Sequence, residues 1–244
     1  MNHGLVAFLL QVPLPSVPPT TPPFAVGEIL EYSARYGMLR PGIAQLAVVK
    51  VDTVRGVPSW VFSFTSEVSL LRFYSNRSKL TSWTGQPDFV SRRFLKEIEE
   101  KGKRRVEDFA IFPDSGFYRR GSDTLTHPAS AAPIDDVAFF YFLRTTPLVV
   151  GQTYTYDSYY RKAVNPVTIT VLKRERMTLP DGSKRECLVI RPVVEDRNGM
   201  FAKRAKARIW LTDDAQRLPV QIESTYSFGT VKLVLSRITL GRGQ

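Results

Sequence analysis

Residues 43–51, IAQLAVVKV, show the period-two pattern of a β-strand, and the rest of the chain is interpreted outward from them. In an extended chain, odd-numbered and even-numbered side chains point to opposite faces. Both faces are mainly apolar here, which predicts a strand buried on both sides. Arg55-Gly56 then turns the chain into residues 57–66. The aromatic residues that share one face of this second run are Trp60, Phe62 and Phe64.

The same alternation continues to the carboxyl end of the chain, interrupted by turn residues. Asp181-Gly182 and Asn198-Gly199 are typical two-residue hairpin turns. The predicted strands around these and the remaining turns are 30–36, 167–178, 187–194, 202–212, 220–226 and 231–238. Strands joined by short turns are antiparallel, so the sequence predicts a mainly antiparallel sheet.

Two segments are predicted to be short helices, residues 67–74 and residues 134–144. The second, IDDVAFFYFLR, begins with two carboxylates and ends with Arg144, as the helix dipole favours. It is apolar nearly all round, so it must be buried. We therefore predict an all-β fold, a strongly curved sheet or incomplete β-barrel with one or two short helices, whose open side the aromatic helix fills. Residues 24–240 are predicted to form a single β domain.

Composition limits the chemistry of the chain. It has 34 Lys and Arg against 23 Asp and Glu, a net charge of +11, which favours anionic partners. One cysteine and two histidines cannot assemble a common zinc site. We therefore expect no metal. The chain also has no glycine-rich phosphate loop, so we expect no cofactor.

The amino terminus resembles an export signal. Residues 4–10, GLVAFLL, are apolar but too few to span a bilayer, and a proline-rich stretch follows. We interpret residues 1–23 as a signal-like segment with a spacer, which predicts a periplasmic or cell-envelope protein with no transmembrane span. Met1-Asn2-His3 supplies no lysine or arginine, so an apolar tail is the alternative.

Three stretches of the chain form an ordered set of motifs: FAVGE at 24–28 with Tyr32, DDVAFFYFLR at 135–144 with Gly151, and RIWLTDD at 208–214 with RLPV at 217–220. Together they resemble the bacterial "domain of unknown function 3108" family of exported proteins. The resemblance implies a periplasmic, mostly antiparallel β protein, similar to the half-barrel folds that shelter acyl chains. The family has no established catalytic residues to carry over.

Two groups of residues are candidate binding sites. If residues 202–212 form one strand, a basic row on one face ends in an indole and suits phosphate or sulfate groups. The residues of this row are Arg204, Lys206, Arg208 and Trp210. The second group, an apolar pocket, consists of Trp60, Phe62, Phe64, Phe140 and Tyr141. A solvated strand face and an ordinary packed core are the respective structural alternatives.

Catalytic signals are weak. His127 lies in a Thr-His-Pro loop, Cys187 is expected in a β core, and the neighbouring carboxylates at 99–100, 135–136 and 213–214 point apart in a strand or turn. We therefore predict a non-enzymatic binding, carrier or structural protein for a lipid-like or anionic envelope component. The alternatives are an envelope hydrolase that uses paired carboxylates and, less favoured, a nucleic-acid-binding basic module. The oligomeric state is left open.

Overall fold

Fourteen antiparallel strands form one sheet in the computed structural model, which describes residues 21–70, 74–196, 200–226 and 229–242. The sheet order is β8-β7-β6-β5-β4-β3-β2-β1-β14-β13-β12-β11-β10-β9, and β8 does not pair with β9. The strands are β1 (Ile29–Tyr36), β2 (Leu39–Val54), β3 (Val57–Leu70), β4 (Tyr74–Gly85), β5 (Ser91–Glu100), β6 (Lys103–Phe112), β7 (Phe117–Arg120), β8 (His127–Pro128), β9 (Thr153–Tyr156), β10 (Val167–Thr178), β11 (Lys184–Val194), β12 (Arg208–Thr212), β13 (Pro219–Tyr226) and β14 (Gly229–Thr239). The expected all-β, incompletely closed architecture is confirmed.

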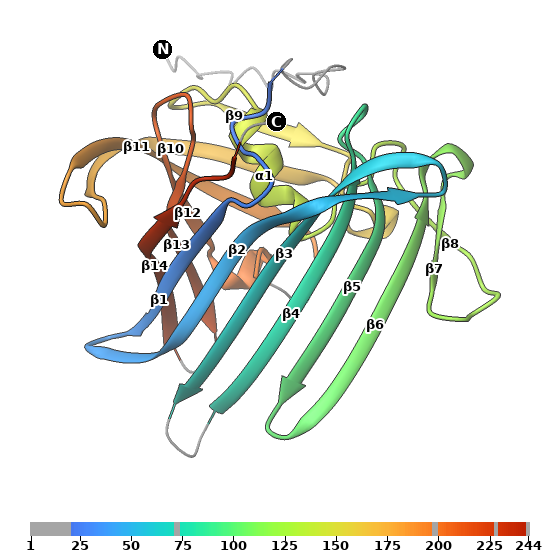
Figure 1. The fold of residues 1–244 in the computed structure, drawn as a ribbon, viewed down its shortest axis with the longest axis horizontal. Helices are drawn as coiled ribbons and strands as arrows, with labels where there is room; N and C mark the ends of the chain where they lie inside the picture. Colours follow the sequence, from blue (N-terminus) through green and yellow to red (C-terminus); the bar gives the residue numbers. More distant parts are fainter. Residues whose placement is uncertain (1–20, 71–73, 197–199, 227–228, 243–244) are drawn as a thin grey trace, which may run out of the picture.

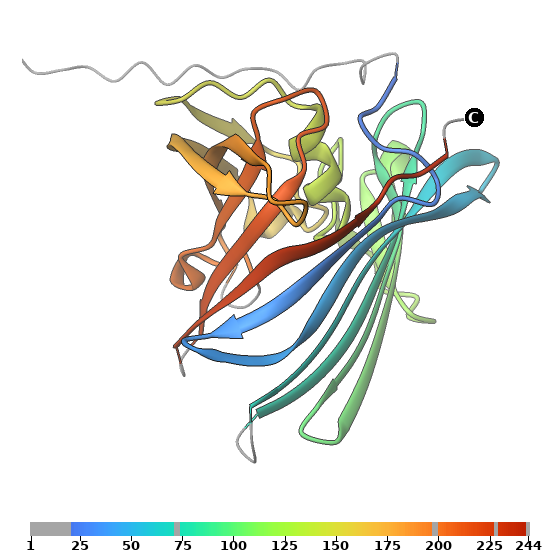
Figure 2. The same cartoon turned by 60° about the vertical axis from the view of Figure 1, so that its left-hand side comes forward.

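The sheet curves so that its two halves face each other. Figure 1 shows β1–β6 as a broad wall in front, with β10–β13 passing behind it, and Figure 2 shows β14 beside β1 where the halves join. Bulges in β2, β5, β10, β13 and β14 add local bend and twist. Isolated bridges from Ala129 to Arg161 and from Ile134 to Tyr159 tie together the segments that follow the two edge strands.

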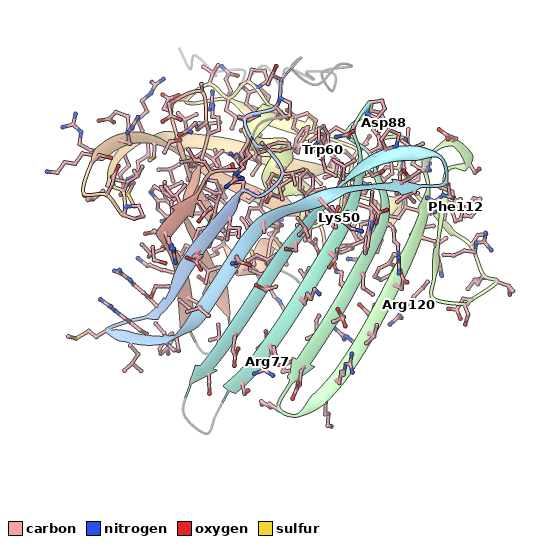
Figure 3. The ribbon with its side chains drawn as sticks, viewed as in Figure 1. Lys50, Trp60, Arg77, Asp88, Phe112 and Arg120 are labelled. Carbon is pink, nitrogen blue, oxygen red and sulfur yellow. The ribbon has the colours of Figure 1, made fainter. Side chains whose placement is uncertain are left out.

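Strand β2 is buried on one face only, contrary to the sequence interpretation. Ile43 is 66% exposed and Val49 is 50% exposed, so these two side chains face solvent in the part of the chain that the structure describes. Val49 is also the extra residue of a bulge, since Val48 pairs with Phe62 and Lys50, labelled in Figure 3, pairs with Val61. After this bulge Val51 pairs with Trp60. The bulge thereby ends the period-two face that joins Val49 to Val51 in the sequence.

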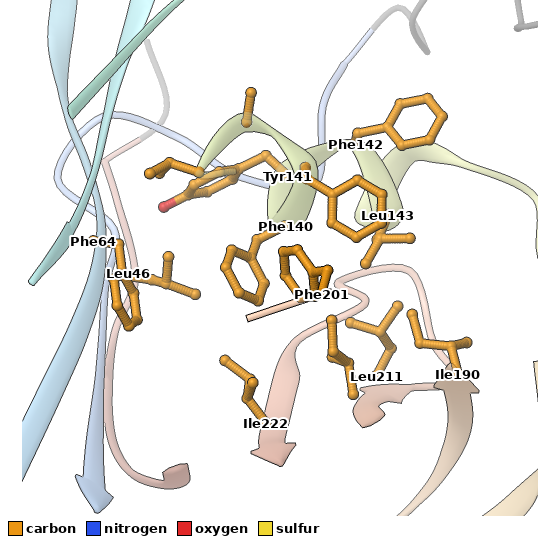
Figure 4. Packing of buried hydrophobic residues seen from close by; sticks show 14 of the residues in the cluster. Leu46, Phe64, Phe140, Tyr141, Phe142, Leu143, Ile190, Phe201, Leu211 and Ile222 are labelled. Atoms are coloured by element: carbon orange, nitrogen blue, oxygen red, sulfur yellow. The ribbon is translucent and has the colours of Figure 1, made fainter. Parts of the chain in front are cut away.

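Helix α1 (Ala138–Thr145) fills the space between the two halves of the sheet, as expected. Residues 138–144 are all buried. Figure 4 shows its aromatic side chains between Leu46 and Phe64 on one side and Ile190, Leu211 and Ile222 on the other. The helix starts later than predicted because the Asp135 carboxylate accepts the backbone N–H groups of residues 137 and 138 from outside the helix.

The helix predicted at residues 67–74 is wrong. Glu67 to Leu70 complete β3, residue 74 begins β4, and residues 71–73 lie outside the described ranges. Arg77 donates to Glu67 across this ladder at 2.7 Å, which is a cross-strand contact rather than a helical one. Within the described ranges α1 is the one α-helix, and three short 3-10 turns occur at Pro113–Ser115, Lys162–Val164 and Lys203–Ala205.

The predicted hairpin around Asp181-Gly182 joins β10 to β11. Its turn is longer than the predicted two residues, because the Leu179 N–H donates to the Ser183 carbonyl at 2.8 Å and residues 180–182 lie between them. Asn198-Gly199 lies outside the described residues, as does most of the signal-like segment, residues 1–20.

Candidate functional site

A groove of about 1080 Å³ opens where the two ends of the described chain meet the β2–β3 hairpin and the β12–β13 turn. Its apolar lining comprises Phe24, Val26, Val51, Trp60 and Leu240. Leu240 is 59% exposed and Val51 is 37% exposed, so apolar surface faces the open space. Cavities of roughly 300–1,000 Å³ with apolar walls are typical small-molecule sites.

Phe24 forms the base of the groove together with Trp60. The Phe24 ring meets the Trp60 ring edge-on, with centroids 5.6 Å apart, and meets the Tyr141 ring at 5.0 Å. Trp60 is held in turn by its cross-strand pairing with Val51. The apolar base therefore rests on the packed core and on a regular ladder.

A buried ion pair fixes one wall. Arg144, at the end of α1, donates to both carboxylate oxygens of Glu28, with 2.9 Å from Nη2 to Oε2. The same guanidinium donates to the carbonyl oxygens of Pro23 at 2.7 Å and Gln216 at 3.2 Å. It thereby joins the amino-terminal segment, α1 and the β12–β13 turn, so the groove is preformed.

The rim carries both signs of charge, but its carboxylates are engaged. Asp213 accepts from Arg174 at 2.7 Å. Asp214 accepts from the Thr212 hydroxyl at 2.8 Å and from the backbone N–H of Gln216 at 3.0 Å. The exposed Arg242 also lines the groove, which leaves its mouth favourable to an anionic group.

Of the five residues predicted to line an apolar pocket, Trp60 lines the groove. The other four belong to the close-packed core. Phe62 stacks on Tyr141 with centroids 3.9 Å apart, and Phe64 stacks on Phe140 at 6.2 Å. These rings fill the centre of the molecule themselves.

The basic residues are not on one continuous strand, so the prediction of a strand over 202–212 is wrong. Arg204 lies in a 3-10 turn, and Lys206 has a left-handed backbone with φ of 45°. Strand β12 begins at Arg208, and Trp210 on it is 5% exposed. Arg204, Lys206 and Arg208 are all exposed, because the intervening Ala205 and Ala207 are buried and anchor the segment. A role for this basic row in binding anions stays a prediction.

The carboxylates of Asp135 and Asp136 serve separate networks. Asp135 is fully buried, which raises its pKa to about 6, and it accepts from the Ser82 hydroxyl at 2.6 Å. Burial alone would raise the pKa of Asp136 as well, but the Lys96 ammonium at 2.9 Å, the Tyr159 hydroxyl and the charge of Arg161 together keep that pKa below its ordinary value. The Tyr159 hydroxyl also donates to Asp136, at 2.7 Å. Each carboxylate thus has its own partners.

The other candidate reactive residues have structural surroundings. His127 stacks on Tyr118 with centroids 5.1 Å apart. Cys187 is buried as expected, which raises its pKa to about 12 and keeps it a neutral thiol. In the described ranges, no three His, Cys, Asp or Glu side chains come together as metal ligands.

Sequence reasoning missed most of the groove. The base residue Phe24 and the pair Glu28–Arg144 stand in motifs that carry the family resemblance, which was the available signal. Leu240 and Val51 carried no such signal. Leu240 reaches the groove because residues 240–242 lie beside the first described residues, and Val51 reaches it because a bulge precedes it in β2.

The fold and the groove define an open, β-barrel-like sheet protein with a preformed, apolar-based site. The chain belongs to the family described as "Protein of unknown function (DUF3108)", whose model matches residues 31–236.

Several solved structures match the chain, including the following two. One is a β-barrel-like protein of the domain of unknown function DUF1849 from Brucella abortus, with a TM-score of 0.55 and 11% identity over 90% of this chain and 99% of that one. The other is a provisionally assigned lipoprotein from Parabacteroides distasonis, with a TM-score of 0.31 and 11% identity over 90% of this chain and 99% of that one. At such identity the first likeness concerns the fold alone. No curated protein matches the chain. None of the helices in the described part has the length and apolar character needed to span a bilayer.

Proposed function

We propose that this protein is a non-enzymatic binding protein of the bacterial periplasm or cell envelope that holds a lipid-like ligand in the groove. The observation that supports it most is the groove itself, which is lined by the exposed side chains of Val51 and Leu240 together with Phe24 and Trp60. An acyl chain laid there removes apolar surface from water, which contributes roughly 25 cal/mol per Å².

The groove suits a ligand with one charged end. Its base is apolar, while Arg217 and Arg242 line it together with carboxylates already paired to arginines. A fatty acid, or a lipid with an acidic head, would place its chain on the base and its head at the mouth. The net charge of +11 adds a long-range attraction for such a ligand.

The envelope location rests on the signal-like residues 1–23 and on the charge of the chain. Cell fractionation with amino-terminal sequencing of the mature protein tests it. We expect the protein in the periplasmic or envelope fraction, and a purely cytosolic protein that keeps Met1 contradicts the location.

Ligand binding is tested with cis-parinaric acid, a fatty acid whose fluorescence rises in an apolar site. We expect saturable binding to the wild-type protein. Val51→Asp and Leu240→Asp each place a carboxylate in the groove beside the bound chain, and each should weaken binding at least roughly tenfold, about 1.4 kcal/mol.

Ile43→Asp is the matched control for Val51→Asp. Ile43 lies on the same strand and is 66% exposed, but it is not part of the groove lining. It should leave binding unchanged. Absence of saturable binding to the wild type, or an equal loss in Ile43→Asp, contradicts the proposal.

A further inference from the structure

Two arginines converge on one aromatic ring far from the groove base. Arg55 lies at the tip of the β2–β3 hairpin, with its Cζ 4.3 Å from the centroid of Phe112. Arg119, on β7, has its Cζ 5.0 Å from the same centroid. Figure 3 labels Phe112 at this hairpin tip. The ring of Phe117 stacks on Phe112 with centroids 4.7 Å apart, and both rings are partly exposed.

The Arg55 guanidinium is anchored but not saturated. Its Nη2 donates to the carbonyl oxygen of Arg92 at 2.8 Å and to that of Ile111. These bonds use one terminal nitrogen, so the Nε–H and the Nη1 donors are left for another partner. The side chain of Arg119 makes no hydrogen bond or ion pair with any residue that the structure describes, so all of its guanidinium donors are available.

The charge around the ring is not balanced. Arg55 and Arg119 contact no carboxylate of the described chain, and the nearby Arg92 is paired with Asp88. Burial lowers the pKa of Arg55, and the charges of Arg92 and Arg119 lower it further. Other arginines of these strands are paired, such as Arg93 with Asp108 at 2.7 Å and Arg120 with Glu107. Two unpaired like charges held together favour an anion between them.

We propose that Arg55 and Arg119 form a binding site for the phosphate group of a phosphate ester. A planar guanidinium matches phosphate oxygens with paired N–H donors, and Arg55 is already oriented by its two carbonyl contacts. Phe112 and Phe117 give the carbon part of the ester an apolar surface to lie on. This site is independent of the groove proposed above.

Isothermal titration with sodium pyrophosphate at low ionic strength tests the site. We expect the wild type to bind and Arg119→Gln to bind at least roughly tenfold more weakly, because the variant loses charge-assisted hydrogen bonds to the phosphate oxygens. The Arg119 side chain contacts the rings of Phe112 and Phe117 but has no hydrogen bond or ion pair among the described residues, so its variant should keep a melting temperature close to that of the wild type. Arg55→Gln should also bind pyrophosphate more weakly. Because this change also removes the bonds from Arg55 to two carbonyl oxygens, its melting temperature is compared with that of the wild type, and a loss of affinity at the same melting temperature supports the site.

Arg77→Gln and Lys184→Gln are the controls for net charge. Each removes one positive charge from an exposed site elsewhere, Arg77 from its pair with Glu67 and Lys184 from the start of β11. Both should leave the pyrophosphate affinity unchanged. No binding by the wild type, or an equal loss in either control, overturns the proposal.

A second titration, with phosphatidylcholine vesicles that contain phosphatidic acid, distinguishes a lipid headgroup from a soluble phosphate ester as the ligand. Binding that Arg119→Gln weakens identifies a lipid headgroup as the source. Binding of pyrophosphate alone identifies a soluble phosphate ester. Vesicle binding that Arg119→Gln leaves intact assigns the lipid contact elsewhere and overturns the headgroup source. Saturation with pyrophosphate should not displace cis-parinaric acid, so the two sites are tested separately.

Discussion

Glu28 and Arg144, which are 116 residues apart in the chain, form a buried bidentate salt bridge. Their side chains are 3% and 1% exposed. Glu28 precedes the first strand and Arg144 ends the helix, so the pair connects the start of the sheet with the element that fills it. The groove wall depends on this connection because Arg144 also holds the carbonyl oxygens of Pro23 and Gln216.

Glu28→Gln should destabilise the protein strongly. Removing one partner leaves a buried guanidinium without its counter-charge, which costs about 3–5 kcal/mol. Urea unfolding of the variant measures this loss. The control is Glu31→Gln in β1, whose exposed pair with Arg237 at 3.6 Å should cost less than about 1 kcal/mol. Equal losses in the two variants would contradict the assigned role of the buried pair.

Asp135 should make folding less favourable as the pH rises. Its pKa is raised by burial from 3.8 to about 6 in the folded protein, so the folded state binds the proton more tightly than the unfolded chain. The stability that this proton provides is complete below about pH 4 and is lost as the pH rises through about 6. Asp135→Asn keeps an oxygen for the backbone N–H groups of residues 137 and 138 but does not titrate.

The unfolding free energy of Asp135→Asn minus that of the wild type should therefore increase between about pH 4 and 6, by up to about 3 kcal/mol, and then level off. Urea titrations at a series of pH values measure it. If the difference in unfolding free energy stays constant over this pH range, the pKa of Asp135 is not raised in the folded protein.

The strands and the curved sheet were predictable because side-chain alternation is a local property. Leu30, Tyr32 and Ala34 alternate in the sequence and are buried together in β1. The aromatic helix at residues 138–145 was predictable for a similar reason, because a short segment that is apolar all round has few alternatives to burial.

Features that depend on strand pairing, on a bulge or on packing between separate segments were not predictable. Residues 67–70 extend a strand because β4 pairs with them, and Val51 leaves the face of Val49 because of a bulge. The basic residues leave the strand because a 3-10 turn at Lys203–Ala205 precedes β12. The groove forms where residues 21–28 and residues 240–242 come together, and a local sequence pattern cannot show a contact between segments so far apart in the chain.

Tyr141→Phe should stabilise the protein. The Tyr141 hydroxyl is buried and has no hydrogen-bond partner within the described residues, so it carries a desolvation cost without compensation. Removing it should raise the unfolding free energy by about 1 kcal/mol. Tyr32→Phe is the matched control, because the Tyr32 hydroxyl donates to the Pro219 carbonyl at 2.8 Å and its loss should cost about 1 kcal/mol. Destabilisation of similar size in both variants would mean that the Tyr141 hydroxyl is satisfied.

Gly42→Ala should destabilise the β2–β3 ladder. A Cβ at Gly42 would lie 1.9 Å from the carbonyl oxygen of Glu67 and 2.8 Å from the Cα of Val68, both backbone atoms that no rotamer change can move. The glycine thus permits β3 to pass closely where the sheet bends. Forcing the strands apart should cost more than about 2 kcal/mol, as overpacking of rigid neighbours does. Ile43→Ala, at the adjacent exposed position, should change the unfolding free energy little, and an equally mild effect of Gly42→Ala would show that the two strands separate there at little cost.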